Sequence, residues 1–376
     1  MDERRKLFLK RDPYSPPKDG VLFLRSVRAN VVHHAKNCPQ YARILEDAGF
    51  DPASLREEAD MARIPVLPTL YFKRNRVFSV PEEKLVIKAS SSGTKGKKSL
   101  IGLDRQSLLL GVGMMFRFFS YYKIISPIPV NYIVLGYEPS ARNQMGAVKT
   151  AYGTTKFAPA LHREYALRDT GEDYELNVGG IKRALLRYAK SPFPVRFVGF
   201  PPYMYFLIKA LKEEGIALKL SKGSKVLLGG GWKQFAGEEI DREEFFRLME
   251  ETLGIKRGSC FEFYSAVEHP MAYVKCREGH FHIPCYSRVI VRDVNTLEPV
   301  GDGKPGLLSF IFPLVTSMPL LSVVTDDLAV RHEGGCACGN SAPYFDLLGR
   351  AGVAEIKTCA ASASELLGGK NDRSAL

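Results

Sequence analysis

The residues best suited to chemistry in this sequence lie in one Ser/Gly/Lys-rich segment, SSSGTKGKKS at 90–99. A predicted strand at 85–89 leads directly into it. Gly93 and Gly96 permit backbone shapes that turn N–H groups inward as a nest for an anion. The polar members add hydroxyl donors and positive charge: Ser91, Ser92, Thr94, Lys95, Lys97 and Lys98. The Walker pattern GxxxxGK[ST] is absent. We therefore predict a phosphate-binding loop of another type; the alternative is a solvated surface loop.

Four later segments carry groups suited to nucleotide or metal chemistry. In chain order they are Gly229-Gly230-Gly231-Trp232, Phe263-Tyr264-Ser265-Ala266-Val267-Glu268, Thr325-Asp326-Asp327-Leu328, and Gly349-Arg350 with Glu355-Ile356-Lys357. A carboxylate such as that of Glu268 offers the oxygen ligands that magnesium prefers. Each short pattern alone arises easily by chance. It is their shared order along residues 90–357 that makes the set informative.

These five segments resemble, in the same order, the motifs of adenylate-forming enzymes, which join a carboxylate to AMP and pass the acyl group on. The loop is similar to the family's S-S-G-T-T-G-x-P-K, although Lys95 stands at the second Thr and the Pro is missing. The resemblance implies ATP as substrate and Mg²⁺ as cofactor. It places Gly229, Gly230, Gly231 and Tyr264 at the adenine and assigns magnesium to Glu268 and the ribose to Asp327. It also implies nucleotide-binding roles for Ser265 and for Arg350, which lies in the hinge sequence. Trp232 either covers the adenine or packs in the core.

Alternating strands and helices in the middle of the chain predict the α/β class, with parallel sheets covered by helices. Strands are expected at 132–135, 195–200, 225–228 and 260–264, and helices at 105–122, 180–188, 204–212 and 242–252. Short β-branched runs then predict a mixed or barrel-like β region. We expect an α/β adenylating core at 1–268, a β-rich subdomain at 269–349, and a short tail at 350–376. That tail would replace the usual lid domain, because only 26 residues follow Arg350 (376 minus 350).

The N-terminal residues His34, Cys38 and Tyr41, with Ile64-Pro65-Val66-Leu67-Pro68 and Gly279-His280-Phe281-His282-Ile283-Pro284, point to one branch of this superfamily. They resemble the LuxE-type acyl-protein synthetases of bacterial luciferase fatty-acid reductase complexes, which are related to phenylacetate–CoA ligases. The resemblance implies that the acyl group passes to a cysteine near the C-terminus, here Cys359. Lys357 would lower the pKa of that thiol or would itself assist adenylation. The alternative is an inert cysteine.

Two further clusters have zinc-ligand spacing: Cys276-x5-His282 and Cys336-Ala337-Cys338. Together they predict a Cys₃His site, and glycines flank the second cluster as in a zinc-knuckle turn. Four protein ligands leave no open position, so this zinc would be structural. His280 and Cys285 are competing ligands. The alternative is a set of unconnected side chains on β turns.

Bulk properties limit the class of protein. The chain has 376 residues, a net charge of +12 and seven scattered cysteines. It has no run of about 18 apolar residues, so no membrane span is expected. The cysteine pattern indicates reduced thiols and a cytoplasmic location. No nucleic-acid-binding signature accompanies the basic charge. We expect an acidic protein partner, either an acyl-accepting reductase or a carrier protein, and a homo- or hetero-oligomer is left open.

Three functions remain open from the sequence. The first is formation of acyl-AMP from a carboxylic acid, of the fatty-acid class, with transfer to a thiol. The second is an aryl- or fatty-acyl–CoA ligase. The third is a nucleotide-binding interaction protein without catalysis. Lys95 in the loop and the missing lid favour this alternative. Retention of Glu268, Asp327 and Arg350 together argues against that third reading.

Overall fold

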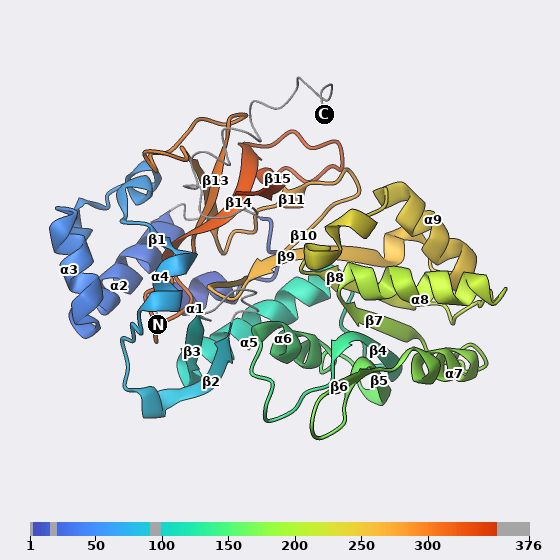
Figure 1. Ribbon diagram of the computed structural model, residues 1–376. Coiled ribbons are helices and arrows are strands. Elements are labelled where there is room, and N and C mark those ends of the chain that lie inside the picture. The colour runs from blue at the N-terminus through green and yellow to red at the C-terminus, as the bar shows by residue number, and fades with distance from the viewer. Residues whose placement is uncertain (1–2, 16–20, 91–98, 352–376) are drawn as a thin grey trace, which may run out of the picture. The chain divides into compact units, whose positions relative to one another are not determined.

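The computed structural model describes residues 3–15, 21–90 and 99–351, whose helices and strands are labelled in Figure 1. The chain divides into two compact units. The first contains Met1–Lys88, Gly93–Tyr121 and Cys276–Leu376, and the second contains Ala89–Ser92 and Tyr122–Lys275. In the described part of the chain, no helix has the length and apolar character needed to cross a membrane.

The second unit is built on a seven-stranded sheet with the order β10-β9-β8-β7-β4-β5-β6. Its strands are β4 (Val130–Tyr137), β5 (Ala160–Asp169), β6 (Tyr174–Leu176), β7 (Val195–Gly199), β8 (Lys225–Gly229), β9 (Cys260–Ala266) and β10 (His269–Val274). The five central strands run parallel, whereas β6 and β10 join the two edges in antiparallel pairing. The predicted α/β class with parallel strands is therefore confirmed.

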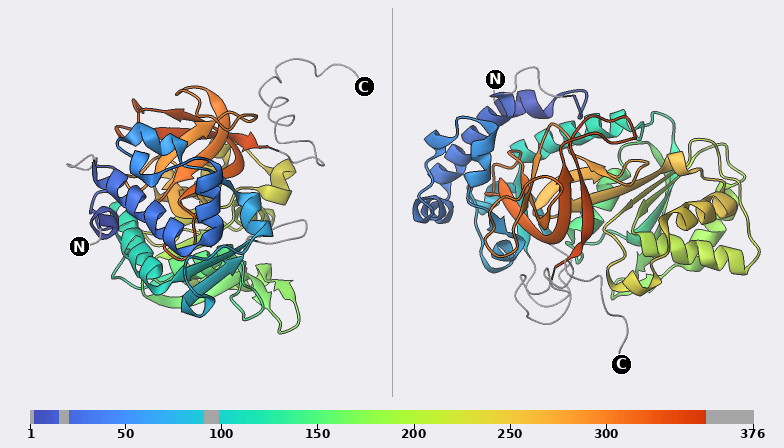
Figure 2. Two further views of the ribbon diagram at one scale, coloured as in Figure 1. Left: turned by 90° about the vertical axis from the view of Figure 1, so that its left-hand side faces the viewer. Right: turned by 90° about the horizontal axis from the view of Figure 1, so that it is seen from above.

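Three helices, α7 (Val178–Tyr188), α8 (Pro201–Glu213) and α9 (Arg242–Leu253), lie together against this sheet (Figures 1 and 2). Their buried side chains form one core cluster with side chains of β4, β7 and β8. Helix α8 begins before the predicted start at residue 204, since proline is tolerated in the first helical turn. A fourth helix, α6 (Gly146–Thr154), contacts β4 and β7.

The first unit contains a six-stranded mixed sheet. Its strands are β1 (Leu67–Pro68), β11 (Phe281–His282), β12 (Arg288–Arg292), β13 (Pro305–Ile311), β14 (Ser322–His332) and β15 (Tyr344–Arg350). Five of them follow the antiparallel path β11-β15-β14-β13-β12, and β1 pairs in parallel with β14. The mixed β region expected from the short β-branched runs is thus present.

Five helices and a short ribbon complete the described part of the first unit. The helices are α1 (Glu3–Phe8), α2 (Val21–Asn37), α3 (Pro39–Asp47), α4 (Thr69–Arg74) and α5 (Arg105–Tyr121). Strands β2 (Leu85–Ser90) and β3 (Leu100–Asp104) form a two-stranded sheet, and short 3₁₀ turns connect other elements. The predicted strand at 85–89 and helix at 105–122 are confirmed. The intervening residues 91–98 lie outside the described residues.

His34, Cys38 and Tyr41 belong to the core of the first unit. The imidazole of His34 is fully buried between Ser79 Oγ, 2.7 Å from Nδ1, and the carbonyl oxygen of Val315, 3.0 Å from Nε2. The ring of Tyr41 stands edge-on to it, with 5.9 Å between ring centroids. Burial lowers the pKa of His34 to about 3. This histidine is therefore uncharged in the folded protein near neutral pH.

This burial predicts a specific loss of stability in mild acid. Because the folded-state pKa of His34 lies below its ordinary value of 6.5, protons favour the unfolded chain as pH falls from 6.5 towards 3. We expect His34 to contribute about 1.4 kcal/mol per pH unit to that loss. Urea unfolding at pH 7, 6 and 5 should show a shallower pH dependence in His34→Gln than in the wild type. Equal pH slopes for the two proteins would contradict the assignment.

Candidate active site

The end of β2, the start of α6 and the turn between β9 and β10 converge in the second unit. Ser90 forms an isolated parallel bridge with Met145, and its N–H donates to the carbonyl oxygen of Gln144 at 2.9 Å. A side chain at Gly146 would crowd Val267. A Cβ there would lie 2.9 Å from a methyl of Val267 and 3.6 Å from the carbonyl oxygen of Ser90. Segments distant in sequence therefore meet here through the Ser90–Gln144 hydrogen bond and the close approach of Gly146 to Val267.

The predicted phosphate loop starts at this convergence. Its candidate residues Ser91, Ser92, Gly93, Thr94, Lys95, Gly96 and Lys98 lie outside the described residues. Ser90 is its last described neighbour on the N-terminal side, and Ser99 resumes the described chain as a buried residue. Ser90 itself is bridged to Met145 just before α6, and Gly146 at the start of α6 approaches Val267 in the turn that carries Glu268.

Glu268 is buried in the turn between β9 and β10, with 5% of its surface exposed. The next residue, His269, is wholly buried, and its Nε2 lies 2.7 Å from the hydroxyl oxygen of Tyr273. Burial lowers the pKa of His269 to about 3, so this neighbour is uncharged near neutral pH. A carboxylate in such a position supplies hard oxygen donors, which fit Mg²⁺. On strand β9, Tyr264 pairs with Tyr273 and is partly buried, while Ser265 is exposed.

The glycine run follows the carboxyl end of β8. Gly229 pairs with Phe263 on β9, and Gly230 and Gly231 have φ values of +83° and +62°, where other residues are strained. Trp232 packs in the core, with ring centroids 5.7 Å from Tyr205 and 5.8 Å from Phe245. The core position is thus the one the structure gives to Trp232. In open parallel sheets, ligands bind beside the carboxyl ends of the strands, where these glycines lie.

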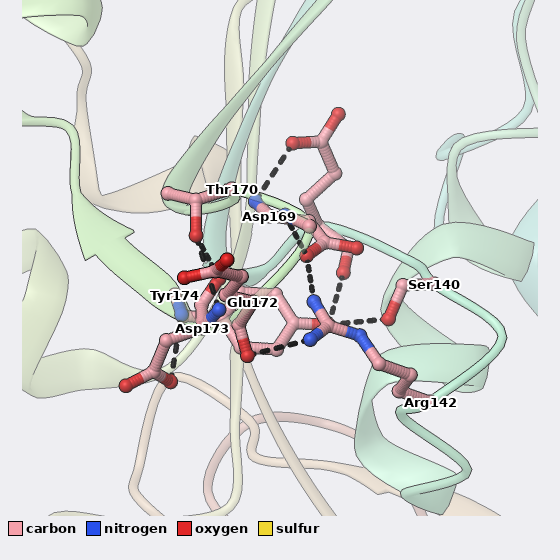
Figure 3. A network of polar contacts seen from close by, with 9 residues as sticks. Ser140, Arg142, Asp169, Thr170, Glu172, Asp173 and Tyr174 are labelled. Atoms are coloured by element: carbon pink, nitrogen blue, oxygen red, sulfur yellow. Dashed lines mark hydrogen bonds and ion pairs between the residues drawn. The ribbon is translucent and has the colours of Figure 1, made fainter.

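A polar network fixes the loop that joins β4 to α6 (Figure 3). The guanidinium of Arg142 donates to the carboxylate of Asp169 and, at 2.6 Å, to the carbonyl oxygen of Glu172. The N–H of Gly171 and the Arg142 charge hold the pKa of Asp169 below its usual range. The hydroxyl of Tyr174 donates to the carbonyl oxygen of Glu138 at 3.0 Å. Three residues beyond Arg142, the same loop reaches the bridge between Met145 and Ser90.

Sequence reasoning missed Arg142, Asp169 and Gly146. The ion pair joins residues 27 apart, and no short motif links them. Gly146 looks like an ordinary glycine at a helix start. Only the folded structure shows that Gly146 lies so close to Val267 that a side chain there would be crowded.

In the first unit, the structure brings the Asp326-Asp327 segment beside Arg350. Asp327 on β14 is the register partner of Arg350 on β15. Nη2 of Arg350 lies 3.7 Å from Asp326 Oδ2, and Nε lies 3.9 Å from Asp327 Oδ1. The Arg350 side chain is 61% exposed, so this pair is open to solvent. Two segments predicted to serve one ligand are therefore adjacent on paired strands.

The four predicted zinc ligands also meet in the first unit. The ligand atoms of Cys276, His282, Cys336 and Cys338 all lie within 4.8 Å of one another. The competing candidates are directed elsewhere. Nδ1 of His280 lies 2.6 Å from a carboxylate oxygen of Asp346, and Sγ of the buried Cys285 lies 4.0 Å from the carbonyl oxygen of Asp12. The remaining catalytic candidates, Lys357 and Cys359, lie outside the described residues.

Comparison with known proteins points to one family. Residues 3–368 match the family described as "Acyl-protein synthetase, LuxE". The chain is 24% identical over 367 residues to the long-chain-fatty-acid–luciferin-component ligase of Vibrio harveyi, covering 96% of this chain and 92% of the relative. It is 24% identical over 334 residues to the phenylacetate–coenzyme A ligase of Thermus thermophilus, covering 86% of this chain and 69% of that protein.

Among solved structures, the fold is similar to that of 2-hydroxyisobutyryl-CoA ligase in an open conformation with 2-HIB-AMP and CoA. The TM-score is 0.68 at 18% identity, and the match covers 91% of this chain and 77% of that one. At this identity the likeness concerns the fold. It agrees with the α/β architecture expected from the sequence.

The Arg142 network generates a test of how the loop before α6 is held. Arg142→Ala removes the donors to Asp169 and Glu172, so we expect amide exchange in residues 138–146 to become about three- to tenfold faster. Hydrogen–deuterium exchange mass spectrometry measures this. Lys209→Ala, an exposed change on α8, is the control and should leave these amides unchanged. Unchanged exchange in Arg142→Ala would show that the network does not hold the loop.

Proposed function

Because the chain belongs to the LuxE family of acyl-protein synthetases, we propose that it activates a fatty acid with ATP and passes the acyl group to a thiol. The observation that carries this is the family match over residues 3–368. The geometry supports it in the second unit, where the glycine run and the Glu268 turn both follow carboxyl ends of parallel strands. The chain is thus an AMP-forming acyl ligase.

In the first half-reaction, a carboxylate oxygen of the acid attacks the α-phosphorus of ATP. The new oxygen–phosphorus bond forms as the bond to the β-phosphate oxygen breaks, which yields acyl-AMP and pyrophosphate. No proton is transferred, so the protein's contribution is to position the two reactants and to neutralise charge. The loop at 91–98, anchored at Ser90, would hold the phosphates through its N–H, hydroxyl and lysine groups.

Glu268 is our candidate magnesium ligand. Its side chain is buried beside a neutral histidine, and its oxygens are the donor type that Mg²⁺ prefers. Bound there, magnesium would neutralise charge on the phosphates. Gly229, Gly230, Gly231, Tyr264 and Ser265 are our candidates for the adenine. In the first unit, the Asp327 carboxylate is our candidate for the ribose hydroxyls, with Arg350 next to it.

In the second half-reaction, a thiolate attacks the acyl carbonyl carbon. A carbon–sulfur bond forms, the bond to the AMP phosphate oxygen breaks, and the thiol proton goes to solvent. Three of the described cysteines are poor candidates because burial raises the pKa of their thiols. The pKa of Cys38 is raised, that of Cys260 is raised to about 12, and that of Cys285 is raised to about 11. Cys276, Cys336 and Cys338 are grouped with a histidine. A relay on this chain is thus best assigned to Cys359, with Lys357 beside it to favour the thiolate.

A protein acceptor is part of the proposal. The net charge of +12 suits an acidic carrier protein or reductase subunit. We also propose a cytoplasmic location, where ATP and reduced thiols occur together.

The second candidate function is an acyl–CoA ligase, favoured by the match to a phenylacetate–coenzyme A ligase over 86% of this chain. The two functions differ in the acceptor thiol.

The adenylation proposal is tested by acid-dependent ATP–pyrophosphate exchange with a panel of fatty and aryl acids. We expect the wild type to exchange with fatty acids, and Glu268→Gln to exchange roughly 100-fold more slowly because a charge-neutralising ligand is lost. Glu262→Gln is the matched control. That carboxylate lies on β9, 2.5 Å from Nε of Arg242, and should leave exchange nearly unchanged.

Full exchange in Glu268→Gln would remove the magnesium assignment. A wild type that binds ATP but exchanges with no acid would favour the non-catalytic alternative. Exchange with aryl acids alone would move the substrate class away from fatty acids.

The relay is tested with radiolabelled fatty acid and ATP. We expect label that survives denaturation and is released by neutral hydroxylamine in the wild type, and loss of at least about nine-tenths of it in Cys359→Ser, because a thioester needs the thiol. Cys260→Ser is the control and should keep the label, since burial raises the pKa of that thiol to about 12. Label retained on Cys359→Ser would exclude this relay. Label found only on added CoA would favour the CoA ligase.

A further inference from the structure

The group of Cys276, His282, Cys336 and Cys338 has the dimensions of a tetrahedral zinc site. With Zn–S bonds of about 2.3 Å and a Zn–N bond of about 2.0 Å, the S–S and S–N edges of a tetrahedron are about 3.8 and 3.5 Å. The sulfurs of Cys276 and Cys336 lie 3.8 Å apart, and Cys338 Sγ lies 3.2 Å from His282 Nε2. All six described cysteines are free thiols, so no disulfide accounts for the grouping.

The polar groups around the cluster prepare its atoms for a cation. Nδ1 of the buried His282 lies 3.0 Å from the carbonyl oxygen of Ala342, which accepts its proton and leaves the Nε2 lone pair facing the sulfurs. Backbone N–H groups of Cys338 and Asn340 donate to the sulfurs of Cys336 and Cys338 at 3.5 and 3.4 Å. These contacts hold the two sulfurs in place beside His282.

Two turns with the same hydrogen-bond pattern carry the cysteines Cys276 and Cys336. In each, a cysteine is followed three residues later by a glycine whose N–H donates to the cysteine's carbonyl oxygen at 3.1 Å: Gly279 to Cys276, and Gly339 to Cys336. These glycines have φ values of +94° and +89°. Because a side chain is strained at such angles, glycine at both positions lets the chain fold back around one point.

We propose that this group is a structural zinc site of the Cys₃His type. It would fasten three places in the first unit: Cys276, where the chain enters that unit from the second; β11, which carries His282; and the 333–343 loop that closes the β14–β15 hairpin. The same hairpin carries Asp327 and Arg350. Four protein ligands leave no open coordination position, so the ion stabilises the fold and takes no part in the reaction.

The test is the zinc content of the untagged full-length protein, measured by elemental analysis after dialysis. We expect one zinc per chain, and loss of most of it in Cys338→Ser and in His282→Gln. Cys260→Ser and His280→Gln are matched controls and should keep the metal, because Cys260 is in the second unit and His280 contacts Asp346. A strong chelator should lower the melting temperature by roughly 5 °C or more in the wild type.

Should the ligand variants fail to fold, cobalt-substituted wild type provides an independent reading. Tetrahedral Co²⁺ with thiolate ligands has intense visible ligand-field bands and a thiolate charge-transfer band, which we expect here. Protein that contains no zinc, or zinc that is retained equally in Cys338→Ser and His282→Gln, would overturn the proposal. So would cobalt spectra without thiolate bands. None of these readouts depends on the proposed ligase activity.

Discussion

Parallel pairing of β9, β8, β7, β4 and β5 is the constraint that positions the candidate catalytic groups of the second unit. Parallel strands end on the same edge of a sheet, so the segments that follow them are brought together whatever their separation in sequence. The pairing of Gly229 with Phe263 sets the glycine run of β8 beside β9, shortly before Glu268. Buried side chains of α7, α8 and α9 pack with those of β4, β7 and β8 in one core and so support this sheet.

A glycine at position 146 allows three segments distant in sequence to approach one another closely. Gly146 lets α6 begin close to Val267 and Ser90, so Ser90, the last described residue before 91–98, lies near the turn that carries Glu268. Arg142 and Asp169 hold the preceding loop in place from the β5–β6 side. The glycine and the ion pair act on the same short stretch of chain. The local geometry at Ser90 is thus set by contacts remote from the loop's own sequence.

The elements could be predicted because each depends on a local pattern. Helices α5, α7 and α9 and strands β8 and β9 match segments expected from the alternation of helix and strand patterns, and the β-branched run Val289-Ile290-Val291 lies in β12. The tight Cys336-Ala337-Cys338 pattern found half of the metal group. Long-range pairing could not be predicted, because nothing local specifies it: Leu67 of β1 pairs with Val323 of β14, 256 residues away (323 minus 67). The spacing predicts His282, with His280 as a competitor, and the structure groups His282 with the three cysteines while His280 contacts Asp346.

The formation of an acyl-adenylate is tested most directly by following the carboxylate oxygen. The acid is labelled with oxygen-18 in its carboxylate, turned over with ATP and a thiol acceptor, and the nucleotide product is examined by mass spectrometry. Attack on the α-phosphorus transfers one labelled oxygen to AMP and none to pyrophosphate, and this is the predicted result. Unlabelled AMP, or ADP with labelled inorganic phosphate, would contradict it.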